Sequence, residues 1–167
     1  MKALGIFIVF LLAFLTYIVF TGSTSPYDVV TGFVAALITG LMFSYVTVKN
    51  PAKVFNHRRW LYAIIYAFKY IIVYETLAHV DVIKRILHPK VPVNPAVVKV
   101  PFYVKTDYGI TAVANSITNT PGTVVLEVDQ NEGVFYVHWI DAKTLEPIEA
   151  RKQISEAFEE YCKKIFE

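Results

Sequence analysis

The 167-residue sequence lacks most of the features that would indicate an enzyme or a disulfide-bonded protein. Its one cysteine, Cys162, excludes a disulfide within the chain and any cysteine-rich zinc or iron–sulfur site. The sequence signatures of phosphate, dinucleotide, redox and zinc sites are missing. Only 18% of the residues are charged, 55% are hydrophobic, and the mean hydropathy is +0.46. This composition argues against an ordinary soluble globular protein.

Charge is unevenly distributed along the chain. Nine Lys/Arg and three acidic residues precede position 96, whereas the remainder has seven Lys/Arg and eleven acidic residues. Residues 1–95 therefore have a net charge of +6, and residues 96–167 have a net charge of −4. An acidic distal half argues against nucleic acid as a partner, because it would repel the phosphates. A basic half followed by an acidic domain is typical of a membrane anchor with a cytoplasmic domain.

Two long runs, residues 3–20 and 29–48, contain no charged side chain. Each is long enough to cross ~30 Å of hydrocarbon as a helix. A cleaved signal peptide is the alternative for the first run, but the run is too long and no small-residue cleavage site follows it. We predict a transmembrane helical hairpin over residues 1–50. Basic residues at both of its ends place those ends in the cytoplasm by the positive-inside rule.

Small residues recur every fourth position on the second predicted span. They are Gly32, Ala36, Gly40 and Ser44. Such a face lets another helix approach closely, and close packing drives helix association in lipid. We expect this face to contact another subunit, the first span of the same chain, or both. Because the two spans carry no ionisable side chain, we also expect any ion path to lie in other subunits.

The segment from Trp60 to His88 has two interpretations. Its apolar start resembles a third membrane crossing, but at ~100° per residue its isoleucines and leucines share one helix face and its basic residues the other. We predict an amphipathic helix at the cytoplasmic membrane surface, followed by a proline-rich connector, over residues 51–95. The alternative, a crossing, would carry several basic residues and the acidic domain outside the cell.

Glu75 and His79 lie one turn apart inside the apolar face of this predicted helix. A charged group there is costly unless it is paired, so we expect the two to bond each other or a group on another subunit. They are either a structural pair at a packing interface or a titratable pair near a proton path.

Residues 96–167 are predicted to form a small cytoplasmic α+β domain. The expected order is a strand near 97–104, a helix over 108–118, strands over 123–129 and 133–141, and a helix over about 149–166. Asp129, His138 and Asp141 are of the residue types found in catalytic and metal sites, but strand alternation places His138 on the opposite face from Asp141. We expect Cys162 to be a small core side chain, and we expect no catalytic residue, bound metal or cofactor.

Residues 116–141 resemble the E subunit of the Mrp-type multisubunit Na+/H+ antiporters. The family has a Thr-Pro-Gly-Thr turn after a helix and two strands, the second ending in a His-x-Ile-Asp-like tetrapeptide. This chain has the turn at 120–123, centred on Pro121 and Gly122, and the tetrapeptide at 138–141. The chain as a whole resembles most the version found in archaeal respiratory membrane-bound hydrogenases.

The resemblance implies a non-catalytic accessory subunit whose partners contain the ion path. Its expected partners are other membrane subunits of the antiporter module, the lipid bilayer and a nickel–iron hydrogenase arm, in which hydrogen evolution from ferredoxin electrons is coupled to ion pumping. It also implies that Pro121 and Gly122 contact other subunits. The alternatives are a dedicated Mrp antiporter component, a stand-alone ion carrier and a membrane-tethered regulatory domain that binds a soluble ligand.

Overall fold

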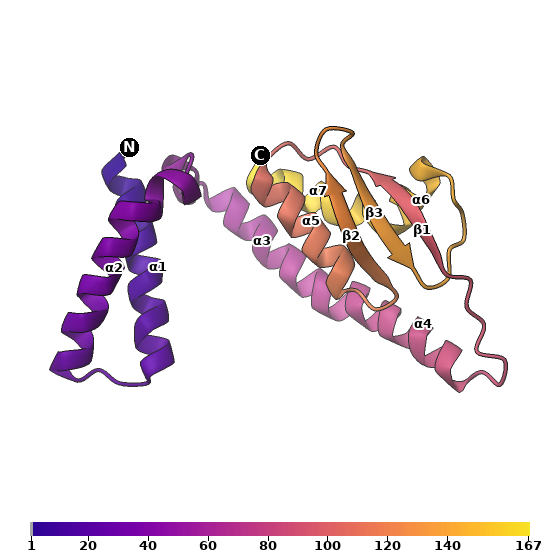
Figure 1. The fold of residues 1–167 in the computed structure, drawn as a ribbon, viewed down its shortest axis with the longest axis horizontal. Helices are drawn as coiled ribbons and strands as arrows, with labels where there is room; N and C mark the ends of the chain where they lie inside the picture. Colours follow the sequence, from indigo (N-terminus) through magenta and orange to yellow (C-terminus); the bar gives the residue numbers. More distant parts are fainter. Residues whose placement is uncertain (1) are drawn as a thin grey trace. The chain divides into compact units, whose positions relative to one another are not determined.

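The computed structural model describes residues 2–167, which form two compact units (Figure 1). The first ends at His57 and the second runs from Arg58 to Glu167. The described residues include three helices long and apolar enough to cross a membrane: Lys2–Thr21, Pro26–Thr47 and His57–Leu87. Only the first two of these are predicted from the sequence to span the membrane.

The first unit is a helical hairpin of α1 (Lys2–Thr21) and α2 (Pro26–Thr47), followed by a short 3-10 helix, η1 (Pro51–Phe55). Gly22, with φ +62°, ends α1 in the left-handed conformation that glycine adopts at no steric cost. The Ser25 hydroxyl accepts a hydrogen bond from the Asp28 N–H, so it caps the start of α2. Pro26 occupies the first helical position, where the N–H group that proline lacks would have no partner within the helix.

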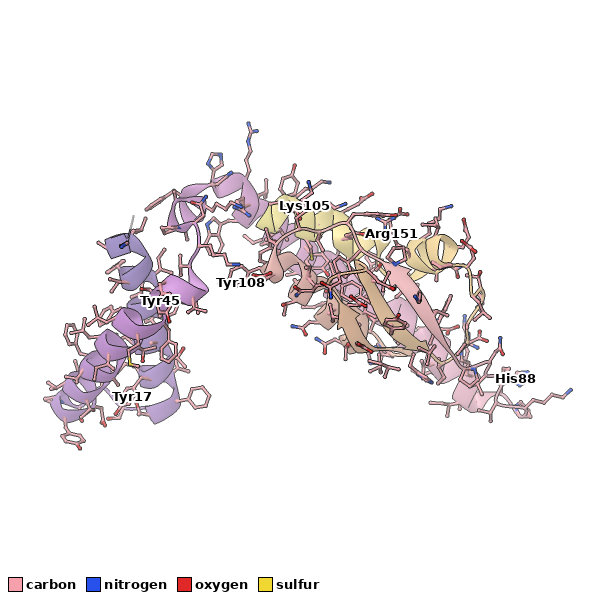
Figure 2. The ribbon with its side chains drawn as sticks, turned by 45° about the horizontal axis from the view of Figure 1, so that its top comes forward. Tyr17, Tyr45, His88, Lys105, Tyr108 and Arg151 are labelled. Atoms are coloured by element: carbon pink, nitrogen blue, oxygen red, sulfur yellow. The ribbon has the colours of Figure 1, made fainter. Side chains whose placement is uncertain are left out.

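A long helix begins the second unit. It consists of α3 (His57–Lys69), a π-helical stretch η2 (Tyr70–Glu75) and α4 (Thr76–Leu87). The π-helix widens the helix by about one residue per turn and therefore shifts which side chains share a face. His88 lies beyond its C-terminal end (Figure 2), before the proline-rich connector.

A three-stranded antiparallel sheet follows the connector, in the order β1 (Ala96–Pro101), β3 (Val134–Trp139) and β2 (Thr123–Asp129). A bulge between Val125 and Glu127 interrupts the β2–β3 register. In the loop between these strands, the Asp129 carboxylate accepts hydrogen bonds from the Asn131 and Glu132 N–H groups.

Helices cover one face of this sheet: α5 (Asp107–Asn119) contacts β2, and α6 (Pro147–Ile154) contacts β1 (Figure 1). The last helix, α7 (Glu156–Phe166), packs beside α5. The core between these layers consists of side chains that are almost inaccessible to solvent. It includes Val98, Val100, Val113, Ile117, Phe135, Val137 and Cys162.

The strands, and the helix after the first of them, lie close to their predicted positions. The predicted final helix is instead two helices, because Ser155 leaves helical geometry at φ −127° and ψ −20°. Ile154 and Phe158, which lie on either side of this break, both reach the core.

Candidate functional site

A groove of about 320 Å³ lies where the long helix meets the ends of α5 and β3. The turn at 120–123 and residues 139–141, which carry the family resemblance, both line it. Tyr74, Ala78 and Arg85 of the long helix line the other side. Two motifs that are separate in the sequence thus meet at one place.

The turn that follows α5 is shaped by Gly122. Its φ of +100° is a conformation that side chains with a Cβ rarely adopt. A Cβ at Gly122 would also lie 3.2 Å from the Ile140 Cγ2. The Ile140 N–H donates to the Gly122 carbonyl at 2.9 Å, and the Thr123 hydroxyl donates to the Ile117 carbonyl at 2.7 Å. The turn therefore ends the helix, starts β2 and joins the end of β3.

Arg85 connects the long helix to the end of the sheet. Its guanidinium lies 2.8 Å from Asp141 and 2.8 Å from Asp81, and it donates to the Pro92 carbonyl at 3.0 Å. Lys143 also bonds the Asp141 carboxylate. The pKa of Asp141 is lowered from its usual value, mainly by the hydrogen bond from Lys143 and further by the positive charge of Arg85.

Three tyrosines attach the long helix to the domain. The Tyr66 hydroxyl bonds the Ser116 hydroxyl, and the Tyr70 hydroxyl donates to the Ser116 carbonyl at 3.1 Å. The Tyr74 ring packs edge-on against Phe158, with ring centres 5.3 Å apart. This face was not predicted from the sequence, although tyrosines at every fourth position from 62 to 74 are a signal of it.

The opposite side of the long helix is apolar and exposed. The side chains that are at least half exposed there are Leu61, Ile64, Phe68, Ile71, Ile72, Leu77, Ile83 and Ile86. In water such a face would be an unusually large apolar patch, so it requires lipid or protein to cover it.

Glu75 and His79 lie together near the middle of the helix. The His79 Nδ1 is 3.4 Å from the Glu75 Oε2 and 2.8 Å from the Glu75 backbone carbonyl oxygen. His79 is exposed, whereas the Glu75 side chain is mostly buried. Within residues 2–167, the buried Glu75 Oε1 has no hydrogen-bond partner. The structure thus brings the pair together, and its predicted contact with another subunit stays a prediction.

The four small residues of α2 are all buried. They face α1 of the same chain: a Cβ on Gly32 would lie 2.5 Å from the Tyr17 ring, and one on Gly40 would lie 3.0 Å from the Ile6 carbonyl oxygen. Tyr17 (Figure 2) also bonds the Thr31 hydroxyl at 2.9 Å. Packing within the hairpin, one of the two expected alternatives, therefore occurs here, and contact of Gly32, Ala36, Gly40 and Ser44 with another subunit stays a prediction.

Comparison with known proteins identifies the family. Residues 10–165 match a family described as a Na+/H+ ion antiporter subunit. The E1 subunit of a Na+/H+ antiporter from Staphylococcus haemolyticus is 34% identical, over 86% of this chain and 87% of that protein. The chain belongs to the family of Na+/H+ antiporter E subunits.

Other relatives support the assignment to the E-subunit family. The E subunit of the Bacillus subtilis antiporter is 28% identical over 78% of this chain and 84% of its own length. That of Alkalihalophilus pseudofirmus is 39% identical, but the match spans only 44% of its length. A chain of the membrane-bound sulfane sulfur reductase, an archaeal respiratory membrane complex, is 31% identical with a TM-score of 0.79, over 97% of this chain and 99% of that chain.

Several other polar residues that the sequence analysis considered have structural partners. Asp141 is bound to Arg85 and Lys143, while Asp129 caps the β2–β3 loop. In the described stretch of the chain, residues 2–167, no three His, Cys, Asp or Glu side chains are grouped to hold a metal ion. Cys162 is fully buried, and burial raises the pKa of its thiol to about 12.

Proposed function

We propose that this chain is a non-catalytic membrane subunit that helps to assemble an Mrp-type ion exchange module within a respiratory membrane complex. The observation that carries the proposal is the likeness, over nearly the full length of both chains, to a chain of an archaeal respiratory membrane complex. The redox arm that we propose is a nickel–iron hydrogenase, in which ferredoxin-driven hydrogen evolution is coupled to ion pumping. A sulfur-reducing arm and a dedicated antiporter are the alternatives.

The arrangement of the second unit supports a helix that lies on the membrane surface. The domain contacts the long helix from Arg59, whose Nε donates to the Ile165 carbonyl, to Arg85, which binds Asp141. These contacts span 26 residues, or ~39 Å at ~1.5 Å per residue, which exceeds the ~30 Å of the hydrocarbon layer. A crossing helix would therefore draw a charged domain into lipid.

The proposed topology follows from this geometry. The α1–α2 hairpin crosses the bilayer, the exposed apolar face of the long helix contacts the cytoplasmic membrane surface or a partner subunit, and the domain lies in the cytoplasm. Lys2 and Lys49, at the two outer ends of the hairpin, favour a cytoplasmic location for those ends.

Uncharged spans support an accessory role. Neither α1 from Ala3 onward nor α2 beyond Asp28 contains a side chain that carries charge at neutral pH. A protein that moved ions by itself would need such groups at membrane depth. The ion path in this proposal belongs to neighbouring subunits, to which the small-residue face, the Glu75–His79 pair and the turn at Pro121–Gly122 lie close.

A separate proposal is that the Glu75–His79 pair lies on or near the proton path. Glu75→Gln and His79→Gln keep the size of each side chain or nearly so. If the pair takes part in proton movement, both variants lower ion exchange in membrane vesicles while the complex still assembles. Normal exchange in both variants would remove the proton-path role, and loss of assembly would make the pair a structural contact instead.

Co-purification tests the main proposal. The tagged protein is isolated from its native membrane in mild detergent, and everything that elutes is identified by mass spectrometry. We expect antiporter-like subunits together with nickel–iron hydrogenase subunits. Recovery of antiporter subunits without a redox arm would make the chain a component of a dedicated antiporter. Recovery of sulfur-reductase subunits would identify a sulfur-reducing arm instead of a hydrogenase. Recovery of the chain alone would overturn the assembly role.

A further inference from the structure

The long helix ends in an apolar tip that is open to solvent. Leu87, the last residue of α4, is 77% exposed, and Val91 in the turn that follows is 52% exposed. Ile83 and Ile86, on the preceding turn of the helix, are at least half exposed and belong to the apolar face described above. That face therefore continues to the end of the helix and onto the turn. We call residues 83–91 the helix tip.

Hydrogen bonds hold the turn of the helix tip in one shape. The Val91 N–H donates to the His88 carbonyl at 2.9 Å, and the Lys90 N–H donates to the His88 Nδ1 at 3.1 Å. Arg85 donates to the Pro92 carbonyl at 3.0 Å. In the described part of the chain, Val91 is the one non-glycine residue with a positive φ, +40°. A β-branched residue keeps such a backbone only where its surroundings impose it, so the turn presents Val91 in a fixed position.

Two carboxylates near the helix tip are already matched by positive charge. Asp81 and Asp141 each lie 2.8 Å from the Arg85 guanidinium. Lys143 bonds the Asp141 carboxylate as well. Two cations thus balance these two carboxylates, and other basic residues at the tip add positive charge in excess.

The excess charge comes from two exposed lysines, Lys84 and Lys90. The sequence contains no acidic residue from position 82 to position 106. Lys84 lies about 100° around the helix from Ile83, which places it at the border of the apolar face. The methylene groups of a lysine can lie along an apolar surface while its ammonium group stays in water. Apolar side chains bordered by lysines are the groups that a negatively charged lipid surface attracts.

We propose that the helix tip binds the surface of a membrane that contains anionic phospholipids. Leu87 and Val91 insert at the boundary between headgroups and acyl chains, and Lys84 and Lys90 lie at the level of the phosphates. Charge complementarity selects this occupant, since a zwitterionic surface offers the lysines no net charge. Lipid is favoured over an acidic peptide because a lipid surface covers both the tip and the adjoining apolar face. The inference rests on the proposed function only in that the long helix lies on the membrane surface.

Fluorescence quenching at a single position tests the proposal. The Leu87→Cys variant of the full-length chain is labelled with the dye nitrobenzoxadiazole. The natural chain, whose one cysteine is fully buried, gives the labelling background. The protein is reconstituted in mixed phosphatidylcholine and phosphatidylglycerol vesicles, in which one lipid or the other carries a nitroxide on its acyl chains near the headgroup. At equal mole fractions, we expect spin-labelled phosphatidylglycerol to quench the dye at least about two-fold more than spin-labelled phosphatidylcholine.

A matched pair of double variants assigns the preference to the two lysines. Lys84→Gln together with Lys90→Gln should reduce the two-fold preference to none. The control, Lys99→Gln with Lys152→Gln, removes the same charge from β1 and α6 and should retain the preference. High salt should weaken the preference in the chain with both lysines, because it screens charges at the surface.

A second label distinguishes failure of this proposal from failure of the proposed topology. Ile71→Cys places the dye on the same apolar face near the middle of the long helix, where the natural side chain is 66% exposed. Quenching by lipid at position 71 without quenching at position 87 would overturn the proposal for the helix tip and leave the long helix on the membrane. Quenching at neither position would overturn the membrane placement of the long helix as well.

Three further outcomes would overturn parts of the proposal. Equal quenching by both spin-labelled lipids at position 87 would remove the preference for anionic lipid. Retention of the preference in the Lys84→Gln, Lys90→Gln variant would remove the role of these lysines. If neither lipid quenched the dye at position 87 and it were shielded from aqueous iodide only in the purified native complex, a protein partner would cover the helix tip instead of lipid.

Discussion

Arg85 of the long helix and Asp141 at the end of β3 are 56 positions apart in the sequence and 2.8 Å apart in the structure. Asp141 is the last residue of the tetrapeptide that marks the family, and Arg85 lies on the helix that we place at the membrane surface. Their contact ties the domain to that helix near the groove. The same helix is held at its other end by the bond from Arg59 to the Ile165 carbonyl.

Asp141→Asn should lower the free energy of unfolding by about 1 kcal/mol at pH 7, because a partly exposed ion pair is worth little more. The pKa of the folded carboxyl is lowered, so its stabilising effect is present above the unfolded pKa of ~3.9 and is lost as the pH falls through the folded value. Chemical unfolding in detergent at pH 7 and below pH 4 checks this.

The control for this prediction is Glu132→Gln, which removes a more exposed carboxylate from its 3.0 Å pair with Lys99. It should change stability less. If Asp141→Asn were equally destabilising at pH 7 and far below pH 4, the loss would not come from the charge.

Gly122→Ala should destabilise the domain by about 1–3 kcal/mol, since the backbone is left-handed and the new methyl group meets Ile140. Gly133→Ala is the matched control: its φ is also positive, at +67°, but the nearest atom to its Cβ is the Phe102 carbonyl oxygen at 3.9 Å. The thermal midpoint of each purified variant measures the difference. Equal losses would mean that backbone strain alone accounts for the effect.

Glu159 is a buried carboxylate whose removal should be costly. It accepts hydrogen bonds from Arg151 at 2.8 and 2.9 Å and from the Tyr103 backbone N–H. Glu159→Gln leaves the Arg151 guanidinium (Figure 2) without its buried counter-charge, for an expected loss of about 3 kcal/mol by urea unfolding.

The matched control for Glu159 is Glu156→Gln. It removes the other carboxylate bound to Arg151, at 2.7 Å, but that side chain is 41% exposed. We expect a loss below about 1 kcal/mol, because water can replace an exposed carboxylate. Similar losses in both variants would show that burial of Glu159 adds nothing.

Tyr66→Phe should loosen the long helix from the domain. It removes the hydroxyl that bonds Ser116 and keeps the ring against Phe158 and Tyr161. The expected loss is about 1 kcal/mol, with faster hydrogen exchange in α3. Tyr108→Phe, at a half-exposed tyrosine of α5, serves as the comparison. Unchanged exchange in α3 would mean that the ring contacts suffice.

Much of the secondary structure was predictable from local pattern. The uncharged runs of α1 and α2, the alternation in β1 and β3, and the apolar spacing in α5 each reflect interactions among residues close in the sequence. The Pro121–Gly122 turn was predictable for the same reason, because its shape depends on the restricted φ of proline and the freedom of glycine. The small-residue face of α2 was visible too, but the sequence left its partner open.

The rest depended on contacts between distant residues. Tyr66 and Ser116 are 50 positions apart and form a hydrogen bond. The partners of the tyrosine face of the long helix are defined only when α5 and α7 pack beside it. The burial of Glu159 does not follow from helical periodicity, since it depends on where Tyr103 and Arg151 lie. Helical periodicity does not predict the break at Ser155 either.

The sequence by itself therefore determined which segments suit lipid, where most of the helices and strands lie, and which motif marks the family, because these depend on composition and near neighbours. Tertiary structure alone decided that the motif halves meet in one groove, that the small-residue face packs against α1, and that the tyrosine face of the long helix binds the domain. Those outcomes depend on packing, in which side chains far apart in the chain compete for the same partners.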